Sequence, residues 1–323
     1  MPNEQEIPDV VYHYTSMDTL LKIVESGFIW ATNIRYLNDV MERRHCLDQI
    51  RSFMSLHEPN EVIDKAKLLG LLDEKQENEK SFYFLPFVAS FSKERDSLPQ
   101  WRSYCPRGNG VSIGFRTESL VNGFVEKFDP FISTGEGKKL KLYRYIPPSV
   151  SFGPVRYLKA DDLIDMAELI AQAVQEAEEM KVDEDGWPQG WDDTDFFYQA
   201  IDKYASRTKH FSFESEREYR LLATTTWGND KSIKYRSSSS TLIPYIPVSL
   251  PNPKKFLHFS DQETIHPIHV ELPSSPLMPY FITSVTIGPT PNLELSADAL
   301  NGFFAARKYG VRIFKSSVPF RDL

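Results

Sequence analysis

The chain has little cysteine and no long hydrophobic run. Cys46 and Cys105 are its only cysteines, and neither lies in a Cys-x-x-Cys motif or a Cys/His cluster. This argues against a disulfide scaffold and against a metal site built on cysteine. The N-terminal residues Met1–Glu6 are polar and acidic, and no segment is apolar enough to span a bilayer. We therefore expect a cytoplasmic protein with no membrane partner.

Basic residues are also fewer than acidic ones, 37 against 45. The formal net charge of the 323-residue chain is -8, which disfavours a broad nucleic-acid surface but leaves a local basic groove open. The two common glycine-rich phosphate loops, GxGxxG and GxxxxGK[ST], do not occur. What the chain does have is the composition of an ordinary globular protein, with 41% hydrophobic residues and enough length to bury a core.

Strand and helix patterns mix along the chain without strict alternation. Ser16 is placed to cap a helix that Gly27 ends. Strands are predicted at 111–115, 218–225 and 281–287, and a helix capped by Ser296 is predicted at 297–308. This pattern favours an α+β fold over a doubly wound parallel sheet. We expect a single domain, with a helical insertion around residues 160–205.

The first candidate site is the hydroxyl-rich end of an apolar strand. His13 is followed by Tyr14, Thr15 and the helix cap Ser16. An imidazole, a phenol and a helix N-terminus in one small volume would suit a nucleotide or another anion. Taken alone, a single histidine is more often a structural residue with satisfied hydrogen bonds.

A second candidate combines serines with an aromatic pair. Ser90 and Ser92 end a predicted buried strand, and Trp101 and Tyr104 follow on a short helix. Residues three apart share a helical face, so the two rings could stack on a flat heteroaromatic ligand. The alternative is an aromatic pair that faces the core.

A third candidate is the charged stretch Phe213–Arg220. If it is extended, Glu216, Glu218 and Arg220 share one face of a strand. Two close carboxylates repel, which raises the pKa of one of them and suits a cationic substrate or an oxocarbenium-like transition state. The alternative is a solvated strand edge that blocks aggregation.

The order of these motifs resembles the bacterial DUF2971 family. The resemblance runs nearly end to end and rests on Tyr12–Ser16, Leu37–Asp39 with Glu42, Ser90–Ser92, Trp101 with Tyr104, Gly110–Phe115, Glu216–Arg220, Ile287–Pro289 and Ser316–Arg321. Taken alone, Asn38, Asp39 and Glu42 are explained as a helix cap with first-turn carboxylates.

The first motif also resembles the one that opens ADP-ribosyltransferases of the His-Tyr-Glu type, where a strand-borne histidine precedes a helix and a glycine. The resemblance implies a core of two packed mixed or antiparallel sheets with peripheral helices. It also implies that NAD is the substrate and that no metal is needed. In this chain His13 would contact the ribose, and Glu218 or Glu216 would be catalytic. The remaining implied NAD-binding residues are Tyr14, Thr15, Ser90, Ser92, Trp101, Tyr104 and Arg220, with Trp101 and Tyr104 as walls for the nicotinamide.

The resemblance therefore implies an NAD-dependent ADP-ribosyltransferase, or an NAD glycohydrolase if water is the acceptor. A carboxylate can stabilise the oxocarbenium-like state of nicotinamide–ribose cleavage. The expected setting is a bacterial toxin or anti-phage effector with a protein or nucleic-acid acceptor and a neutralising or regulatory partner protein. A non-catalytic nucleotide-sensing or protein-interaction module on the same fold is the alternative. A nucleic-acid processing factor is disfavoured by the acidic charge.

Overall fold

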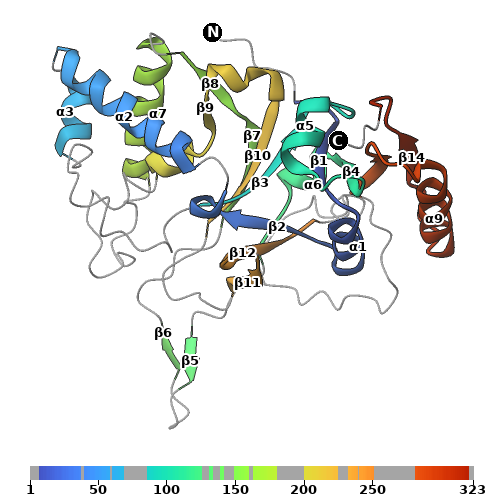
Figure 1. Cartoon of the computed structure of the whole chain (residues 1–323). Helices are drawn as coiled ribbons and strands as arrows, with labels where there is room; N and C mark the ends of the chain where they lie inside the picture. The colour runs from blue at the N-terminus through green and yellow to red at the C-terminus, as the bar shows by residue number, and fades with distance from the viewer. Residues whose placement is uncertain are drawn as a thin grey trace, which may run out of the picture. The chain divides into compact units, whose positions relative to one another are not determined.

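The fold combines helices with parallel and antiparallel strands, which confirms the α+β class (Figure 1). The structure is a computed structural model. It describes residues 7–37, 40–58, 60–68, 86–125, 131–133, 139–141, 149–159, 163–179, 200–224, 232–238, 240–250 and 281–319. The chain divides into two compact units, described separately below: unit 1 is Met1–Phe28, Phe91–Gly123 and Leu250–Leu323, and unit 2 is Ile29–Ser90 and Phe124–Ser249. The single domain expected from the sequence stays a prediction.

Unit 1 is built on a mixed sheet. Its strands are β1 (Val10–Ser16), β4 (Gly110–Arg116), β13 (Ile282–Ile287) and β14 (Arg312–Lys315). β4 lies between β1 and β13 and is antiparallel to both, whereas β14 is parallel to β13. The helix α9 (Leu293–Ala306) connects this parallel pair, as a crossover between parallel strands requires. The last two residues of β3 (Phe87–Ser92) also belong to unit 1, and Ser92 pairs with Tyr12 of β1.

Helix α1 (Met17–Ser26) begins and ends where the sequence predicts. The Ser16 hydroxyl accepts a hydrogen bond from the Thr19 N–H at 3.1 Å. Gly27 has a φ of 74°, a left-handed conformation that a glycine adopts without strain, and its N–H donates to the Ile23 carbonyl. Both predicted helix signals of this segment are confirmed.

The predicted start of α9 is wrong. The helix begins at Leu293, and Asn292 rather than Ser296 occupies the cap position. The Ser296 N–H donates to the Asn292 carbonyl at 2.9 Å, so Ser296 already lies inside the first turn. Glu294 also lies in this turn, where a carboxylate complements the helix dipole and favours the earlier start.

The cap of α1 gives a first testable prediction. Replacing Ser16 by alanine should lower the free energy of unfolding by about 1 kcal/mol, because the Thr19 N–H loses its acceptor. Urea unfolding followed by circular dichroism would measure the change. Asn301→Ala, at an exposed position in the middle of α9, is the control and should cost nothing. Equal stability of Ser16→Ala and the wild type would contradict the cap.

Unit 2 contains a second group of strands. β2 (Phe28–Asn33) is antiparallel to β3. β10 (Glu218–Ala223) also pairs with β3 and is antiparallel to β7 (Val150–Pro154). β11 (Lys234–Ser237) is antiparallel to β12 (Leu242–Ser249). Two shorter pairs are parallel β8 (Arg156–Leu158) with β9 (Thr208–His210) and antiparallel β5 (Phe131–Ser133) with β6 (Lys139–Lys141). All six residues of β10 are buried, so this strand lies in the interior of the unit.

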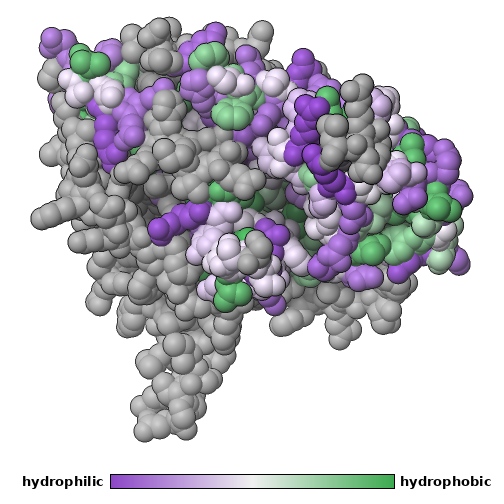
Figure 2. All heavy atoms as spheres, in the orientation of Figure 1, coloured by the Kyte–Doolittle hydropathy of each residue, from purple (hydrophilic) through white to green (hydrophobic). Residues whose placement is uncertain are grey.

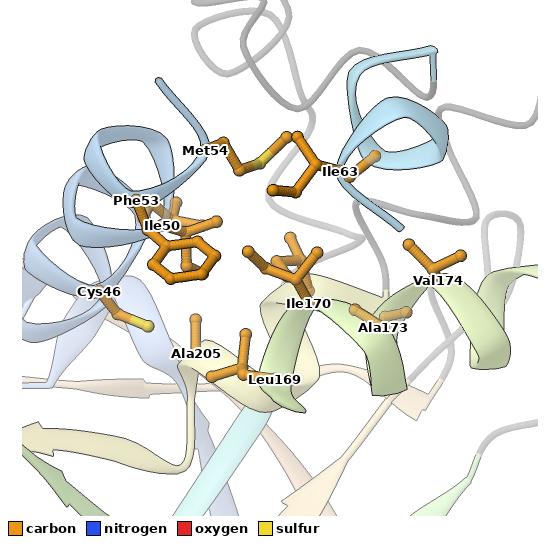
Figure 3. Close-up of a cluster of buried hydrophobic side chains, with 14 of the residues drawn as sticks. Cys46, Ile50, Phe53, Met54, Ile63, Leu169, Ile170, Ala173, Val174 and Ala205 are labelled. Carbon is orange, nitrogen blue, oxygen red and sulfur yellow. The ribbon is translucent and has the colours of Figure 1, made fainter. Parts of the chain in front are cut away.

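Helices of unit 2 form their own hydrophobic cluster. It joins α2 (Val40–Leu56), α3 (Glu61–Leu68), α7 (Leu163–Glu179) and a helical turn at residues 200–205. Figure 3 shows Ile50 and Phe53 of α2 facing Leu169 and Ile170 of α7. Ile50 and Ile170 are fully buried, and this cluster therefore gives the helices a core of their own. Of the predicted insertion around 160–205, the structure describes residues 163–179 and 200–205.

The remaining short helices connect strands. They are η1 (Ile34–Tyr36), α5 (Leu98–Tyr104), α6 (Thr117–Val121) and η3 (Phe211–Glu216). Across the ranges described, no helix combines the length and the apolar character needed to cross a membrane. Exposed hydrophobic residues among those described include Leu295 on α9, at 71% exposure. Figure 2 shows green hydrophobic atoms among purple ones at the position of α9.

Candidate functional site

The predicted site residues fall into two groups. His13, Tyr14, Thr15, Ser92, Trp101 and Tyr104 belong to unit 1, and Ser90, Glu216, Glu218 and Arg220 belong to unit 2. Each group is built below from its own unit. Asn38 and Asp39 lie outside the described residues, and of Glu42 only the backbone, within α2, is described.

His13 lies on an aromatic face of β1. Its ring centroid is 5.6 Å from that of Phe91 and 6.3 Å from that of Phe115. Phe115 is fully buried, and His13 itself is half-buried. The imidazole therefore packs against two aromatic rings on this face.

Tyr14 points to the other face of β1. Its phenol donates a hydrogen bond to the Glu94 carbonyl at 2.7 Å and accepts one from the Ser97 N–H at 3.0 Å. Burial raises the pKa of this phenol far above its ordinary value, so it stays neutral. The two hydrogen bonds tie β1 to the segment that leads into α5.

Trp101 of α5 packs on this second face. Its ring centroid is 4.7 Å from that of Tyr14, and the side chain is only 5% exposed. A Cβ atom on Gly288 would lie 2.9 Å from the indole, so the bare glycine makes room for the ring. Because successive side chains of a strand point to opposite faces, His13 and the Tyr14–Trp101 pair lie on opposite faces of β1. Unit 1 thus does not bring His13 and Trp101 together.

Asp96 is a residue that the sequence reasoning missed. It accepts hydrogen bonds from the Trp101 indole N–H at 2.8 Å, the Ser316 hydroxyl at 2.6 Å and the Ser317 N–H at 2.7 Å. Burial acts to raise the pKa of Asp96, but the hydrogen bonds from Ser316, Ser317 and Trp101 outweigh it and hold the pKa below its ordinary value. Asp96 therefore anchors the C-terminal serines and the tryptophan with one ionised carboxylate. The Ser316 motif was the only sequence signal for this contact.

The other predicted residues of unit 1 make local contacts. The Thr15 carbonyl accepts a hydrogen bond from the Cys105 thiol at 3.3 Å, and burial raises the pKa of that thiol to about 12. Ser92 is buried, and its hydroxyl accepts a hydrogen bond from the Glu94 N–H at 3.1 Å. Tyr104 is half-buried at the end of α5. Cys105 is thus a neutral thiol rather than a reactive one.

In unit 2 the Glu-x-Glu motif is not one continuous strand. Glu216 ends the 3₁₀ helix η3, and β10 begins only at Glu218. Arg217 between them has a φ of 45°, a left-handed conformation, and its N–H donates to the Glu214 carbonyl. The predicted alternation therefore holds for Glu218 and Arg220 but is wrong for Glu216, because the chain turns at Arg217.

Glu218 lies in a buried ionic cluster. The Arg220 guanidinium donates from Nε to Oε1 at 2.7 Å and from Nη2 to Oε2 at 3.1 Å. This bidentate geometry is typical of a strong ion pair. The Lys209 Nζ lies 3.1 Å from the same Oε2. Arg220 also donates to the Ser206 carbonyl at 2.7 Å. Glu218 is 5% exposed and Arg220 is 3% exposed, so both charges are buried and paired.

Neighbouring cations determine the electrostatics of Glu218. Burial acts to raise its pKa, but the charges of Arg220 and Lys209 and hydrogen bonds from Arg220 and Ser90 hold the pKa below its ordinary value. The expected repulsion between two carboxylates does not govern Glu218, because cations neutralise it. Glu218 is therefore an ionised carboxylate inside the protein.

Lys209 is the second residue that the sequence reasoning missed. Its ammonium donates to Glu216 Oε2 at 2.7 Å as well as contacting Glu218, and its side chain is fully buried. Lys209 is the middle residue of the short strand β9. A lone lysine seven residues before Glu216 carries no motif, so only the folded chain identifies it.

Comparison with known proteins identifies a family for the middle of the chain. No curated protein and no solved structure matches the chain. The family match spans Trp101, Tyr104, residues 110–115 and the Glu216–Arg220 motif, and it also runs through 160–205. His13 and the C-terminal motifs lie outside it. Residues 100–221 match the model of the family described as "Protein of unknown function (DUF2971)", which confirms the predicted family over these residues.

Proposed function

We propose that this chain is an NAD-dependent ADP-ribosyltransferase or NAD glycohydrolase in which Glu218 is the catalytic carboxylate. The observation that supports it most is the burial of Glu218 between Arg220 and Lys209, whose charges favour its ionised form. A fixed negative charge in a water-poor setting can stabilise a developing oxocarbenium ion far better than an exposed one. The resemblance of the Glu216–Arg220 motif to the Glu-x-Glu of ADP-ribosyltransferases supports the same assignment.

The proposed reaction breaks the bond between the nicotinamide nitrogen and C1 of the ribose. Nicotinamide leaves as a neutral ring with the electron pair, and the positive charge passes to the ribose. Glu218 would accept a hydrogen bond from a ribose hydroxyl and stabilise this charge. Water or a macromolecular nucleophile then adds to C1 and loses a proton, which yields ADP-ribose or an ADP-ribosylated acceptor.

Glu216 would prepare the acceptor, the role that the resemblance implies for the first glutamate of the motif. The proposal does not use Trp101 as a wall for the nicotinamide, because the indole is buried against Tyr14 and Gly288 and bonded to Asp96. Moving it to meet a ligand would uncover a core residue.

The test is nicotinamide release from NAD by the purified chain, with and without bacterial lysate as a source of acceptor. Glu218→Gln should lower the rate about 100-fold, because the neutral amide no longer stabilises the positive charge. Glu61→Gln is the matched control, since Glu61 is a carboxylate of the same unit with 83% of its side chain exposed, and it should leave the rate unchanged. Release that survives both Glu218→Gln and Glu216→Gln would overturn the assignment.

A non-catalytic nucleotide-sensing module is the second candidate. It is favoured by the engagement of both Glu218 oxygens, one by Arg220 and the other by Arg220 and Lys209. Saturable NAD binding in calorimetry, without nicotinamide release in any condition, would support this function instead. Thermal unfolding of each variant shows whether a lost rate reflects chemistry or unfolding.

A further inference from the structure

The ionic cluster of unit 2 contains a charged group to which neither the motifs nor the family match gives a role. This group is the Lys209 ammonium. Its Nζ lies 2.7 Å from Glu216 Oε2 and 3.1 Å from Glu218 Oε2, and its side chain has no exposed surface. A buried lysine costs free energy unless its charge is compensated, and here two carboxylates compensate it.

The position of Lys209 links three elements of the chain. Lys209 comes from β9, Glu216 from the end of η3 and Glu218 from the start of β10. Its Nζ also lies 4.9 Å from the centroid of the Phe213 ring of η3, within the range of a cation–π contact. The ammonium therefore contacts the residues on both sides of the left-handed turn at Arg217.

The backbone of this turn has a second support. The Tyr157 hydroxyl of β8 accepts a hydrogen bond from the Glu218 N–H at 2.7 Å, and burial raises the pKa of this phenol to about 12. Tyr157 is thus a neutral group that holds the main chain of Glu218. Lys209 is the cation that holds the side chains of the two glutamates together.

We propose that Lys209 is a positioning residue of the proposed catalytic site, whose ammonium holds the side chains of Glu216 and Glu218 next to each other. This inference rests on the proposed function, because the pair matters for catalysis only if Glu218 acts on NAD. Arg220 binds both oxygens of Glu218. Lys209 contacts Oε2 of Glu216 and Oε2 of Glu218, and its single charge therefore couples the two carboxylates.

The charged and titratable groups facing Glu218 define what a substitution would change. They are Arg220 on β10, Lys209 on β9, Glu216 on η3 and Tyr157 on β8, and Ser90 on β3 adds a neutral hydrogen bond. Replacing Lys209 by methionine keeps the length of the side chain and removes its charge. Glu216 and Glu218 then repel each other directly, so the protonated form of Glu218 is favoured. Arg220 still pairs with Glu218, so the site retains one cation.

The first experiment measures nicotinamide release by Lys209→Met as a function of pH. We expect kcat to fall roughly 10- to 100-fold through misplacement of the pair, with KM for NAD unchanged. The acid limb of the rate profile should move to higher pH. Adding Glu216→Gln to Lys209→Met should move the limb back, because it removes the repelling charge. Lys234→Met, at an exposed lysine of β11 in the same unit, is the control and should match the wild type.

A second measurement does not depend on NAD turnover. Titration of ¹³C-labelled glutamate carboxylates by NMR, with Glu218→Gln used for assignment, should place the Glu218 transition at higher pH in Lys209→Met than in the wild type. If the wild type releases no nicotinamide, the proposed function fails while this titration still decides the role of Lys209. Unchanged Glu218 titration and an unchanged rate profile in a folded Lys209→Met chain would overturn the inference. If Lys209→Met alone does not fold, the double variant with Glu216→Gln, compared with Glu216→Gln alone, gives the same decision.

Discussion

Replacing Arg220 by methionine should lower the free energy of unfolding by about 3 kcal/mol or more. The substitution removes both hydrogen bonds from the guanidinium to Glu218 and leaves this 5%-exposed carboxylate without its main partner. It also removes the hydrogen bond to the Ser206 carbonyl. The loss should lie near the lower end of the range for buried pairs, because Lys209 still contacts Glu218. Guanidinium unfolding followed by circular dichroism measures it.

The pH dependence gives the same prediction a second signature. The pKa of Glu218 lies below its ordinary value in the folded chain, so its ionised form stabilises the fold at neutral pH. This stabilisation is lost as the pH falls below the ordinary glutamate range and through the folded pKa. In Arg220→Met the folded pKa is less depressed. We therefore expect a smaller difference in stability between neutral and acidic pH than in the wild type.

Controls separate the ion pair from a general loss of side-chain volume. Arg156→Met changes an exposed arginine on β8 of the same unit and should cost less than 1 kcal/mol. Removing both charges, with Arg220→Met and Glu218→Gln together, should recover part of the stability lost in Arg220→Met, because no unpaired carboxylate remains. A loss below 1 kcal/mol in Arg220→Met would contradict the buried pair.

Local signals predicted the short elements well. The Ser16 cap and Gly27 stop of α1 act within one helical turn, so their residues alone determine the geometry. The strand from Glu218 was also predicted, because its apolar residues Tyr219, Leu221 and Leu222 favour burial. The α+β class follows from the mixture of such elements. The start of α9 was misplaced because Asn292 and Ser296 are both acceptable cap residues, and the packing of the helix decides between them.

The candidate site was predicted less completely, since its chemistry depends on contacts between distant residues. Glu218 and Arg220 were predicted to share a face and do so, as strand alternation alone requires. Lys209 and Tyr157 reach the same carboxylate or its backbone from β9 and β8, and neither carries a motif. The predicted repulsion between the two carboxylates did not specify which pKa would rise, and the charges of Arg220 and Lys209 lower that of Glu218. Charge compensation by Lys209, which lies in another strand, is not visible in the spacing of the motif.

Asp96 illustrates the same limit in unit 1. The sequence offered Trp101 as a ligand-stacking ring or as a core residue. The choice depended on a carboxylate five residues earlier and on serines more than two hundred residues later. An indole N–H needs an acceptor when it is buried, and Asp96 supplies it. A tryptophan with a satisfied N–H and 5% exposure is a structural anchor for α5 and the C-terminal segment.

Replacing Trp101 by alanine should therefore lower the free energy of unfolding by about 3–5 kcal/mol. The substitution empties the space between Tyr14, Gly110 and Gly288 that the ring fills. It also removes one of the hydrogen bonds to the ionised Asp96. Trp101→Phe keeps most of the volume and should lose about 1.5–3 kcal/mol, the range for a hydrogen bond to a charged group. Guanidinium unfolding of both variants gives the two values under one set of conditions.

The comparison between stability and NAD affinity decides what Trp101 does. Leu295→Ala is the control, because Leu295 is 71% exposed on α9 of the same unit and its loss should change stability by less than 1 kcal/mol. If Trp101 were a wall for nicotinamide, Trp101→Phe would retain stacking, and Trp101→Ala would raise KM for NAD without a matching loss of stability. We expect instead that Trp101→Ala loses stability and that its folded fraction keeps the wild-type KM for NAD. The reason is that the ring packs on the face of β1 opposite His13. A stable Trp101→Ala chain with weakened NAD binding would show that Trp101 contacts NAD. It would also require α5 to move when NAD binds.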